Sequence, residues 1–334
     1  MTTAGVACRP GRVRRLGRAV RGAALSGTCL ASVAAAGAVA SRRATYPRPR
    51  HDAPGRPAAR PAPAGRIVVA VVLGPRGSVG TDALAPYEVF ARSPAFFVYT
   101  VSPGRAASVL SGGPALVPEH SLEDVDAGSV PEPDVVVVPA VVNAAGKDLA
   151  PLREWITRHA GRGAHILSVC AGSALLAAAG LLDGRRATSH WSNIASLRRK
   201  HPQVEWVRGQ RYVVDGSITT TGGVTSGIFG ALRLVGQLAG TAEAERMGQE
   251  LAYPGWRPGA PASMPAQRAA PGDLSYALTA AFPWLRPTVG IGLVTCVGEI
   301  DAAAAFDIYA GNSHAARAVP IAGFLPAAAR RHRP

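Results

Sequence analysis

The sequence predicts an α/β protein in which helices sandwich a doubly wound, mostly parallel sheet. Two observations carry this prediction. Several continuous apolar runs are rich in β-branched residues, as expected for strands buried on both faces of a parallel sheet. These runs alternate with segments of helical length, and such alternation is typical of crossover connections within one sheet.

The expected elements follow one another from residue 66 to about residue 255. In order they are the strand RIVVAVVLG (66–74), the helix DALAPYEVFARS, the strands AFFVYTVSP and PDVVVVPA, the helix DLAPLREWITRHAGRG, the strand AHILSVC, the helix GSALLAAAGLLDG, a hairpin in EWVRGQRYVVDGSITTTGG and the helix TSGIFGALRLVGQLAG. The chain has 334 residues, of which 48% are hydrophobic, so it can bury a core of about two domains.

Composition divides the chain into five segments. They are a leader (1–41), a Pro/Arg-rich linker (42–65), the main domain (66–255), a Pro/Gly-rich second linker (256–286) and a C-terminal segment (287–334).

The positive charge is concentrated before the main domain. Residues 1–66 contain thirteen Arg and one acid, Asp52, and so account for +12 of the net charge of +15. The remaining residues are close to neutral and offer no broad surface for phosphates. We therefore expect no nucleic-acid partner.

The leader contains an uncharged run, GAALSGTCLASVAAAGAVA (22–40), between Arg-rich flanks. Its length is about enough to span a bilayer, and AVA before Ser41 is similar to a cleavage site. An export signal or a membrane tether through residues 22–40 is the favoured interpretation, with an exported or anchored protein as its consequence. The alternative is a disordered Ala/Gly-rich leader or a misassigned start, which would leave the protein in the cytoplasm.

The cysteine positions do not predict a set of disulfide bonds. Two of the four, Cys8 and Cys29, lie in the leader, and the chain has no CxxC motif and no clustered His/Cys spacing. We therefore expect neither a disulfide scaffold nor a metal site. No organic cofactor is implied either.

Cys170 lies where a strand is expected to turn into a helix. A nucleophile at such an elbow needs small neighbours two residues away on each side, and Ser168 and Gly172 meet that need. The amino end of the following helix would lower the pKa of the thiol and offer N–H groups to an oxyanion. The alternative is a buried thiol that only packs in the core.

Three separated motifs carry a family resemblance. They are TDALAPYEVF (81–90), VCAGSALLAAAGLLDGRRATSHW (169–191) and VDGSITTTGGVTSGIFGALRLV (214–235). Together they resemble the DJ-1/PfpI family of the class I glutamine amidotransferase-like superfamily. Within it they are similar to the isonitrile hydratase group and to the amidase-like sensor domains of AraC-type regulators. The resemblance covers residues 66–255 and implies a flavodoxin-like sandwich with the cysteine on an elbow.

The resemblance also implies roles for individual residues. Cys170 matches the family nucleophile, and Asp82 matches an acid that serves in proton transfer, although Asp82 could instead cap its helix. The backbone N–H groups of Ala171, Ala140 and Val141 are the expected oxyanion donors.

A candidate pocket surrounds this site. Its residues are His190 and Thr188 in ATSHW, and Gly222 and Gly223 in TTTGGVTSG, a segment that a tight loop and helix start would also need. Glu88, further along the helix of Asp82, is expected to be exposed or paired with a partner.

The departures from the family pattern concern the residues beside the nucleophile. Ala171 stands where relatives carry His or, in the hydratase group, Thr, and Ala140-Val141 replaces the usual Gly-Gly. A Cys–His–acid triad is therefore unsupported, and at most a Cys–acid pair remains.

The C-terminal segment resembles the start of the main domain. DAAAAFDIYA (301–310) set against DALAPYEVFA (82–91) gives four identities in ten positions and four conservative exchanges. We interpret this as a partial internal repeat, with chance similarity between Ala-rich helices as the alternative. Only 33 residues follow Asp301, so this copy has no room for its own elbow.

Two functions remain open. One is a cysteine-dependent hydratase or hydrolase acting on a small electrophilic substrate, with Cys170 attacking and Asp82 relaying a proton. The other is a small-ligand or redox-sensing module without a DNA-binding domain, because the segment after residue 255 offers no paired helices for a major groove. A homodimer is expected from the family resemblance.

Overall fold

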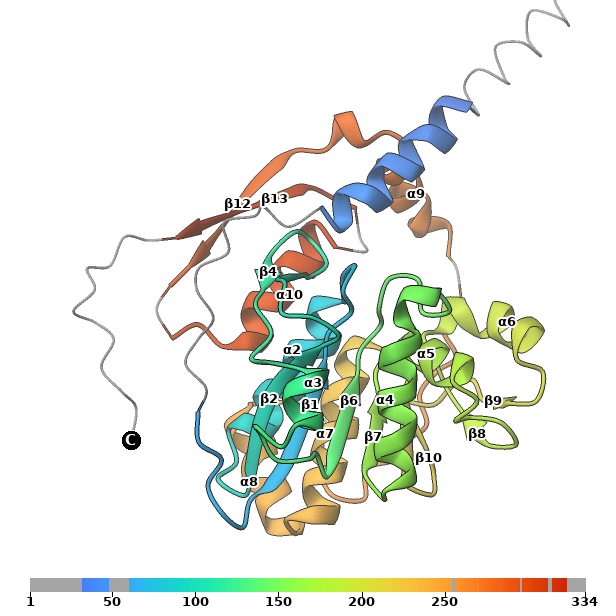
Figure 1. Cartoon of the computed structure of the whole chain (residues 1–334). Coiled ribbons are helices and arrows are strands. Elements are labelled where there is room, and N and C mark those ends of the chain that lie inside the picture. The colour runs from blue at the N-terminus through green and yellow to red at the C-terminus, as the bar shows by residue number, and fades with distance from the viewer. Residues whose placement is uncertain are drawn as a thin grey trace, which may run out of the picture.

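A seven-stranded sheet forms the centre of the computed structural model, which describes residues 32–47, 60–253, 256–268, 270–294, 296–311 and 314–322 (Figure 1). The strand order is β10-β11-β7-β6-β1-β2-β5. Neighbouring strands are parallel except in the β10–β11 hairpin. The strands are β1 (Ile67–Val72), β2 (Phe96–Ser102), β5 (His120–Ser121), β6 (Val135–Val138), β7 (His165–Ser168), β10 (Tyr212–Asp215) and β11 (Ile218–Thr221). The predicted α/β sandwich is confirmed.

Helices cover both faces of this sheet because its central strands are apolar on both sides. In β1, Val68, Ala70 and Val72 belong to one buried core and Val69 and Val71 to the other. The first core packs on α3 (Leu122–Asp126), α4 (Ala150–Gly161), α5 (Gly172–Ala178) and α6 (Trp191–Lys200). The second packs on α2 (Gly80–Ala91), α7 (Val224–Leu238) and α8 (Thr241–Glu250). Burial on two faces is what a continuous run of Val and Ile predicts.

Short elements complete the main domain. They are the strand pairs β3 (Ser108–Val109) with β4 (Ala115–Leu116) and β8 (Arg186–Ala187) with β9 (Glu205–Trp206), and the 3₁₀ turn η1 (Lys147–Leu149).

A second, smaller unit follows the main domain. It consists of β12 (Thr288–Leu293), α10 (Glu299–Tyr309) and β13 (Arg317–Ala322), with β12 and β13 paired in parallel. Figure 1 shows α10 beside α2, with the β12–β13 pair on the outer side of α10. The predicted second linker contains helical structure of its own: η2 (Pro271–Asp273), α9 (Leu274–Ala281) and η3 (Pro283–Leu285).

A helix over residues 32–45 crosses the predicted boundary between leader and linker. It lies beside α9, where the buried hydroxyl of Ser41 donates a hydrogen bond of 2.5 Å to the carbonyl of Ala280 (Figure 1). Among the residues that the structure describes, no helix is long and apolar enough to cross a membrane. Residues 22–31 of the predicted signal or tether lie outside the described residues.

Candidate active site

The candidate site lies at the carboxyl edge of the main sheet. The chain places β2 and β5 on one side of β1 and β6, β7 and β11 on the other, so the strand order reverses between β1 and β6. Open α/β sheets bind ligands at such a switch point. Asp82 follows β1, Ala140 follows β6, Cys170 follows β7 and Gly223 follows β11, so the topology brings these predicted residues together.

Cys170 occupies a strained turn between β7 and α5. Its φ is +56°, a left-handed conformation that costs an L-residue roughly 1–2 kcal/mol. Gly172 makes this turn possible, because a Cβ atom there would lie 2.1 Å from the carbonyl oxygen of Val138. The hydroxyls of Ser173 and Ser189 donate hydrogen bonds to the Cys170 carbonyl at 3.3 and 3.2 Å. These hydrogen bonds hold the backbone of the turn in place, and only 8% of Cys170 is exposed.

Asp82 lies fully buried in the first turn of α2. The N-cap of this helix is Val79, so the alternative that Asp82 caps its helix is wrong. Its Oδ2 accepts a hydrogen bond from the Ala140 N–H at 3.3 Å. No described residue donates a hydrogen bond of normal length and angle to its other oxygen, the buried Oδ1. Burial, and next the nearby charge of Asp307, raise the pKa of Asp82 to about 8. This carboxyl is consequently protonated at neutral pH.

Burial and the Asp82 carboxyl together raise the pKa of the Cys170 thiol. The N–H of Ala171 at the start of α5 hydrogen-bonds to the thiol and lowers this pKa, as the sequence predicts, but its effect is smaller. The net direction is opposite to the predicted one, because removal of the thiolate from water outweighs the helix terminus. The resting site therefore holds two protons, one on sulfur and one on the carboxyl.

The expected oxyanion donors do not form one open cradle. The Ala140 N–H, predicted as a donor to substrate, is bonded to Asp82. Val141 packs against the loop after β1, where its Cβ lies 3.0 Å from the position that a Cβ on Gly74 would occupy. The Ala171 N–H is the predicted donor that lies directly at the sulfur.

The predicted pocket residues separate into two pairs. Gly223 and His190 adjoin the cysteine: a Cβ on Gly223 would lie 3.7 Å from Cys170 Sγ and 3.2 Å from His190 Cδ2. Burial lowers the pKa of His190, so its ring is neutral at neutral pH, and its Nδ1 lies 2.8 Å from Ser192 Oγ.

Thr188 and Gly222 serve the surrounding structure instead. The Thr188 hydroxyl donates to the Val207 carbonyl at 2.9 Å. Gly222 packs on Gln210 and Met264, where an added Cβ would lie 3.0 Å from the Gln210 carbonyl oxygen and 3.1 Å from Met264 Cε. The cavity that Thr188 lines measures ≈ 10 Å³, about the size of one water molecule.

Sequence reasoning missed two neighbours of the site, and both come from outside the main domain. Tyr46 packs over Gly77 in the loop after β1, and its hydroxyl pKa is raised by burial and by Asp307, Asp82 and Cys170. Asp307 of α10 accepts hydrogen bonds from the N–H and hydroxyl of Thr81, the residue before Asp82. Tyr46 carried no signal because it lies in a predicted linker, whereas Asp307 lies within the stretch that resembles residues 82–91.

A larger cavity of ≈ 660 Å³ lies at the opposite edge of the sheet, at the amino ends of β1, β6 and β7. It is lined by residues such as Ile67, Asp134 and His165 and does not reach Cys170. The candidate site is thus a closed cluster of buried side chains rather than an open pocket.

Comparison with known proteins identifies the fold family. The family model described as DJ-1/PfpI family matches residues 68–237. The chain belongs to the DJ-1/PfpI family. It is 35% identical over 179 residues to an isonitrile hydratase of Pseudomonas putida, and this match covers 52% of the chain and 72% of the relative. It is 31% identical over 176 residues to the transcriptional regulator CdhR of Pseudomonas aeruginosa, covering 48% of the chain and 52% of that regulator.

Solved structures of DJ-1/PfpI proteins have the same fold. A THiJ/PfpI family protein from Pseudomonas syringae matches with a TM-score of 0.53 and 26% identity, over 72% of this chain and 91% of its own. A DJ-1 superfamily protein from Salmonella typhimurium matches with a TM-score of 0.50 and 25% identity, over 57% of this chain and all of its own. The predicted family resemblance and flavodoxin-like fold are confirmed.

Proposed function

We propose that this DJ-1/PfpI protein is a cysteine-dependent hydratase or hydrolase that acts on a small electrophilic carbon. The observation that carries the proposal is the pairing of Cys170, on its strained turn, with the fully buried carboxyl of Asp82, whose pKa burial raises to about 8. The similarity to an isonitrile hydratase over 72% of that enzyme supports the same substrate class.

The two protons of the resting site suit a relay. Asp82 donates its proton to the substrate as Cys170 Sγ forms a bond to the electrophilic carbon, and the carboxylate then takes the thiol proton. With an isonitrile, the carbon gains one hydrogen and one sulfur bond and becomes a thioimidate. Water then adds to that carbon, the C–S bond breaks, and the formamide leaves as the proton returns to sulfur. The Ala171 N–H stabilises charge near the sulfur during these steps.

The test is turnover by the full chain. Purified protein is incubated with a panel of isonitriles, aldehydes and amides beside Cys170→Ala and Asp82→Asn. We expect product with at least one class, its loss in Cys170→Ala, and a rate reduced by about 10²-fold or more in Asp82→Asn. Equal turnover by the parent and Cys170→Ala, or none by either, would rule out the enzyme for those substrates.

A ligand-sensing or redox-sensing module is the second candidate, and the closure of the site favours it. Asp82 is fully buried and Cys170 is 8% exposed, so a substrate needs the site to open. The similarity to a transcriptional regulator over about half of that regulator is compatible with this role. Binding of a panel compound that stabilises the parent against heat, without turnover, distinguishes the sensor from the enzyme.

We also propose that residues 22–40 direct export or tether the protein to a membrane. The uncharged run between Arg-rich flanks supports this proposal. Amino-terminal sequencing tests it: a mature start at Ser41, or an intact leader in the membrane fraction, is expected. A mature start at Thr2 in the soluble fraction would contradict both.

A further inference from the structure

The C-terminal unit β12–α10–β13 depends on α2 for its burial. Its described apolar side chains are buried at few positions: Ile291, Ala303, Phe306 and Ala316. Large side chains on the rest of the unit, such as Ile308 and Ile321, are more than half exposed. Ala303 faces Gly80 at the start of α2, and Phe306 packs on Gly112. The unit therefore resembles a partner bound to the main domain more than a domain with its own core.

Two acid–amide contacts join α2 and α10 reciprocally. Glu88 of α2 accepts a hydrogen bond of 2.6 Å from the N–H of Ile300, at the start of α10. Asp307 of α10 accepts one of 2.9 Å from the N–H of Thr81, at the start of α2. In each helix the acid lies seven residues after the amide, so exchanging the two helices reproduces the pair of contacts. Such reciprocity defines an isologous, two-fold interface.

The two units also share their order and pairing. In both, a helix connects two strands that pair in parallel, β1 with β2 and β12 with β13. Setting Asp301 on Asp82 places Ile300 on Thr81 and Asp307 on Glu88. The sequence alignment and the reciprocal contacts are independent observations, and both select the same register.

We infer that the C-terminal unit is an internal repeat of β1–α2–β2. It packs on α2 at the place where another molecule of this chain would bind in a two-fold dimer. A two-fold interface built on α2 needs a free α2 in each copy. Here α10 of the same chain covers it, so chains do not pair with one another through this face. Unlike a complete copy, the unit brings no second cysteine site and has the exposed Asp301 where the main domain has buried Asp82.

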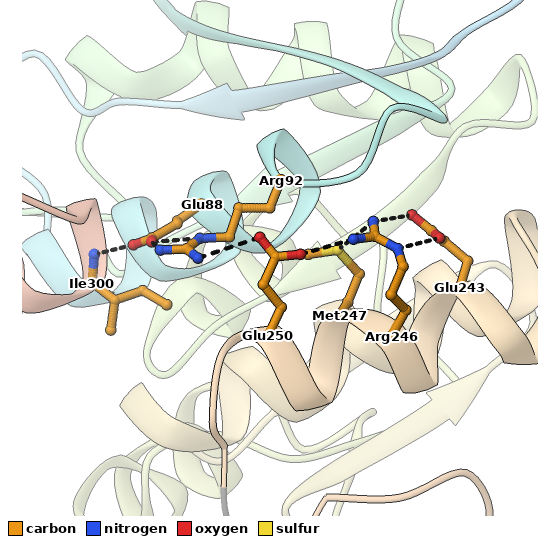
Figure 2. Close-up of polar contacts among 7 residues, drawn as sticks. All are labelled: Glu88, Arg92, Glu243, Arg246, Met247, Glu250 and Ile300. Carbon is orange, nitrogen blue, oxygen red and sulfur yellow. Dashed lines mark hydrogen bonds and ion pairs between the residues drawn. The ribbon is translucent and has the colours of Figure 1, made fainter. Parts of the chain in front are cut away.

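Docking also positions the first turn of α2, which carries Asp82. Asp307 holds Thr81 through its N–H and hydroxyl and is itself bonded by the Ser111 hydroxyl. At the other end of the interface, Figure 2 shows Glu88 between Ile300 and Arg92. Arg92 also lies near Glu250 of α8, at 3.5 Å. Asp307 is thus a positioning residue for the candidate site.

Hydrogen exchange of the full chain at several protein concentrations tests the inference. We expect the amides of the first two turns of α2 to be protected in the parent to the same extent over an about hundredfold range of concentration, because the cover belongs to the same chain. Asp307→Asn and Glu88→Gln each remove a charged acceptor and are expected to speed exchange at the starts of both α2 and α10 by about tenfold. The matched control is Asp301→Asn, the same change at an exposed position of α10.

A second substitution is designed to push the C-terminal unit away from α2 within one chain. Ala303→Lys places a long charged side chain against Gly80, whereas Ile308→Lys makes the change on the exposed side of the same helix. In Ala303→Lys we expect the α2 amides to exchange rapidly at low protein concentration. At high concentration their protection should return, and sedimentation should show a doubled mass.

Three results would overturn the inference. They are parent protection that rises with concentration, unchanged protection in both Ala303→Lys and Asp307→Asn, and a loss of protection in Ala303→Lys that no increase in concentration restores. None of these measurements depends on turnover at Cys170.

Discussion

Asp82 and Cys170 interact inside the protein in a way that keeps the proton on sulfur. The carboxyl raises the pKa of the thiol, whereas the thiol lowers the pKa of the carboxyl without offsetting the effect of burial. Above the folded-state pKa of about 8 the Asp82 carboxyl is ionised, and an amide of equal shape then removes the charge that opposes the thiolate. Asp82→Asn is therefore expected to lower the pKa of Cys170.

Alkylation measures this change. In the parent at pH 7, we expect iodoacetamide to modify buried Cys170 at least about tenfold more slowly than exposed Cys296. At about pH 9, where Asp82 is ionised in the parent, Asp82→Asn should raise the rate at Cys170 several-fold while that at Cys296 stays constant, as followed for each peptide by mass spectrometry. Equal rates at the two cysteines in the parent would contradict a thiol of raised pKa.

The buried carboxyl of Asp82 also makes folding stability depend on pH. Its pKa is about 8 in the folded protein against an ordinary value of 3.8, so between these values the folded state binds more protons than the unfolded state. The contribution of this group is fully present below the ordinary value and is lost as the pH rises through the folded-state pKa. Relative to Asp82→Asn, the parent should lose roughly 2.5 kcal/mol of unfolding free energy between pH 5 and pH 7.

Urea unfolding of the parent and Asp82→Asn across this pH range provides the measurement. The matched control is Asp301→Asn, which changes an exposed acid. A difference between the parent and Asp82→Asn that stays constant from pH 4 to pH 8 would show that Asp82 is not protonated in the folded protein.

The left-handed backbone of Cys170 predicts an unusual order of substitutions. Ala normally stabilises a folded chain relative to Gly, but at a φ of +56° only Gly is free of strain. Cys170→Gly is therefore expected to be more stable than Cys170→Ala by about 1 kcal/mol, although both remove the thiol. Chemical denaturation of the two variants decides this, and a more stable Ala variant would contradict the strained turn.

The sequence predicted the parts of this architecture that depend on local patterns. The Val-rich run of β1 requires burial on both faces, and the small residues around Cys170 allow a tight turn, so both could be inferred from neighbouring residues. Glu88 was expected to be exposed or paired; it is paired, but it is buried. One partner, Arg92, is four residues away on the same helix, but the other, Ile300, lies 212 residues away, and no local pattern shows which distant segment covers a helix.

The electrostatics of the site were less predictable for the same reason. The helix terminus at Ala171 could be inferred from sequence, but the net pKa of Cys170 depends on how deeply distant segments bury it. Likewise, the Ala140 N–H was expected to face substrate, and only the packing of α2 against β6 shows that it serves Asp82.

Gly172 tests the tightness of the turn directly. A Cβ at this position would lie 2.1 Å from the carbonyl oxygen of Val138 and 2.9 Å from that of Pro139, and backbone atoms cannot move aside cheaply. Gly172→Ala is therefore expected to lower the unfolding free energy by about 1–3 kcal/mol or more and to displace Cys170. Gly161→Ala is the matched control: it lies at the end of α4 with nothing within 4 Å of an added Cβ, so it should be neutral or stabilise by up to about 1 kcal/mol. Denaturation curves compare the two, and a Gly172→Ala protein as stable as Gly161→Ala would show that the turn has room that the structure does not.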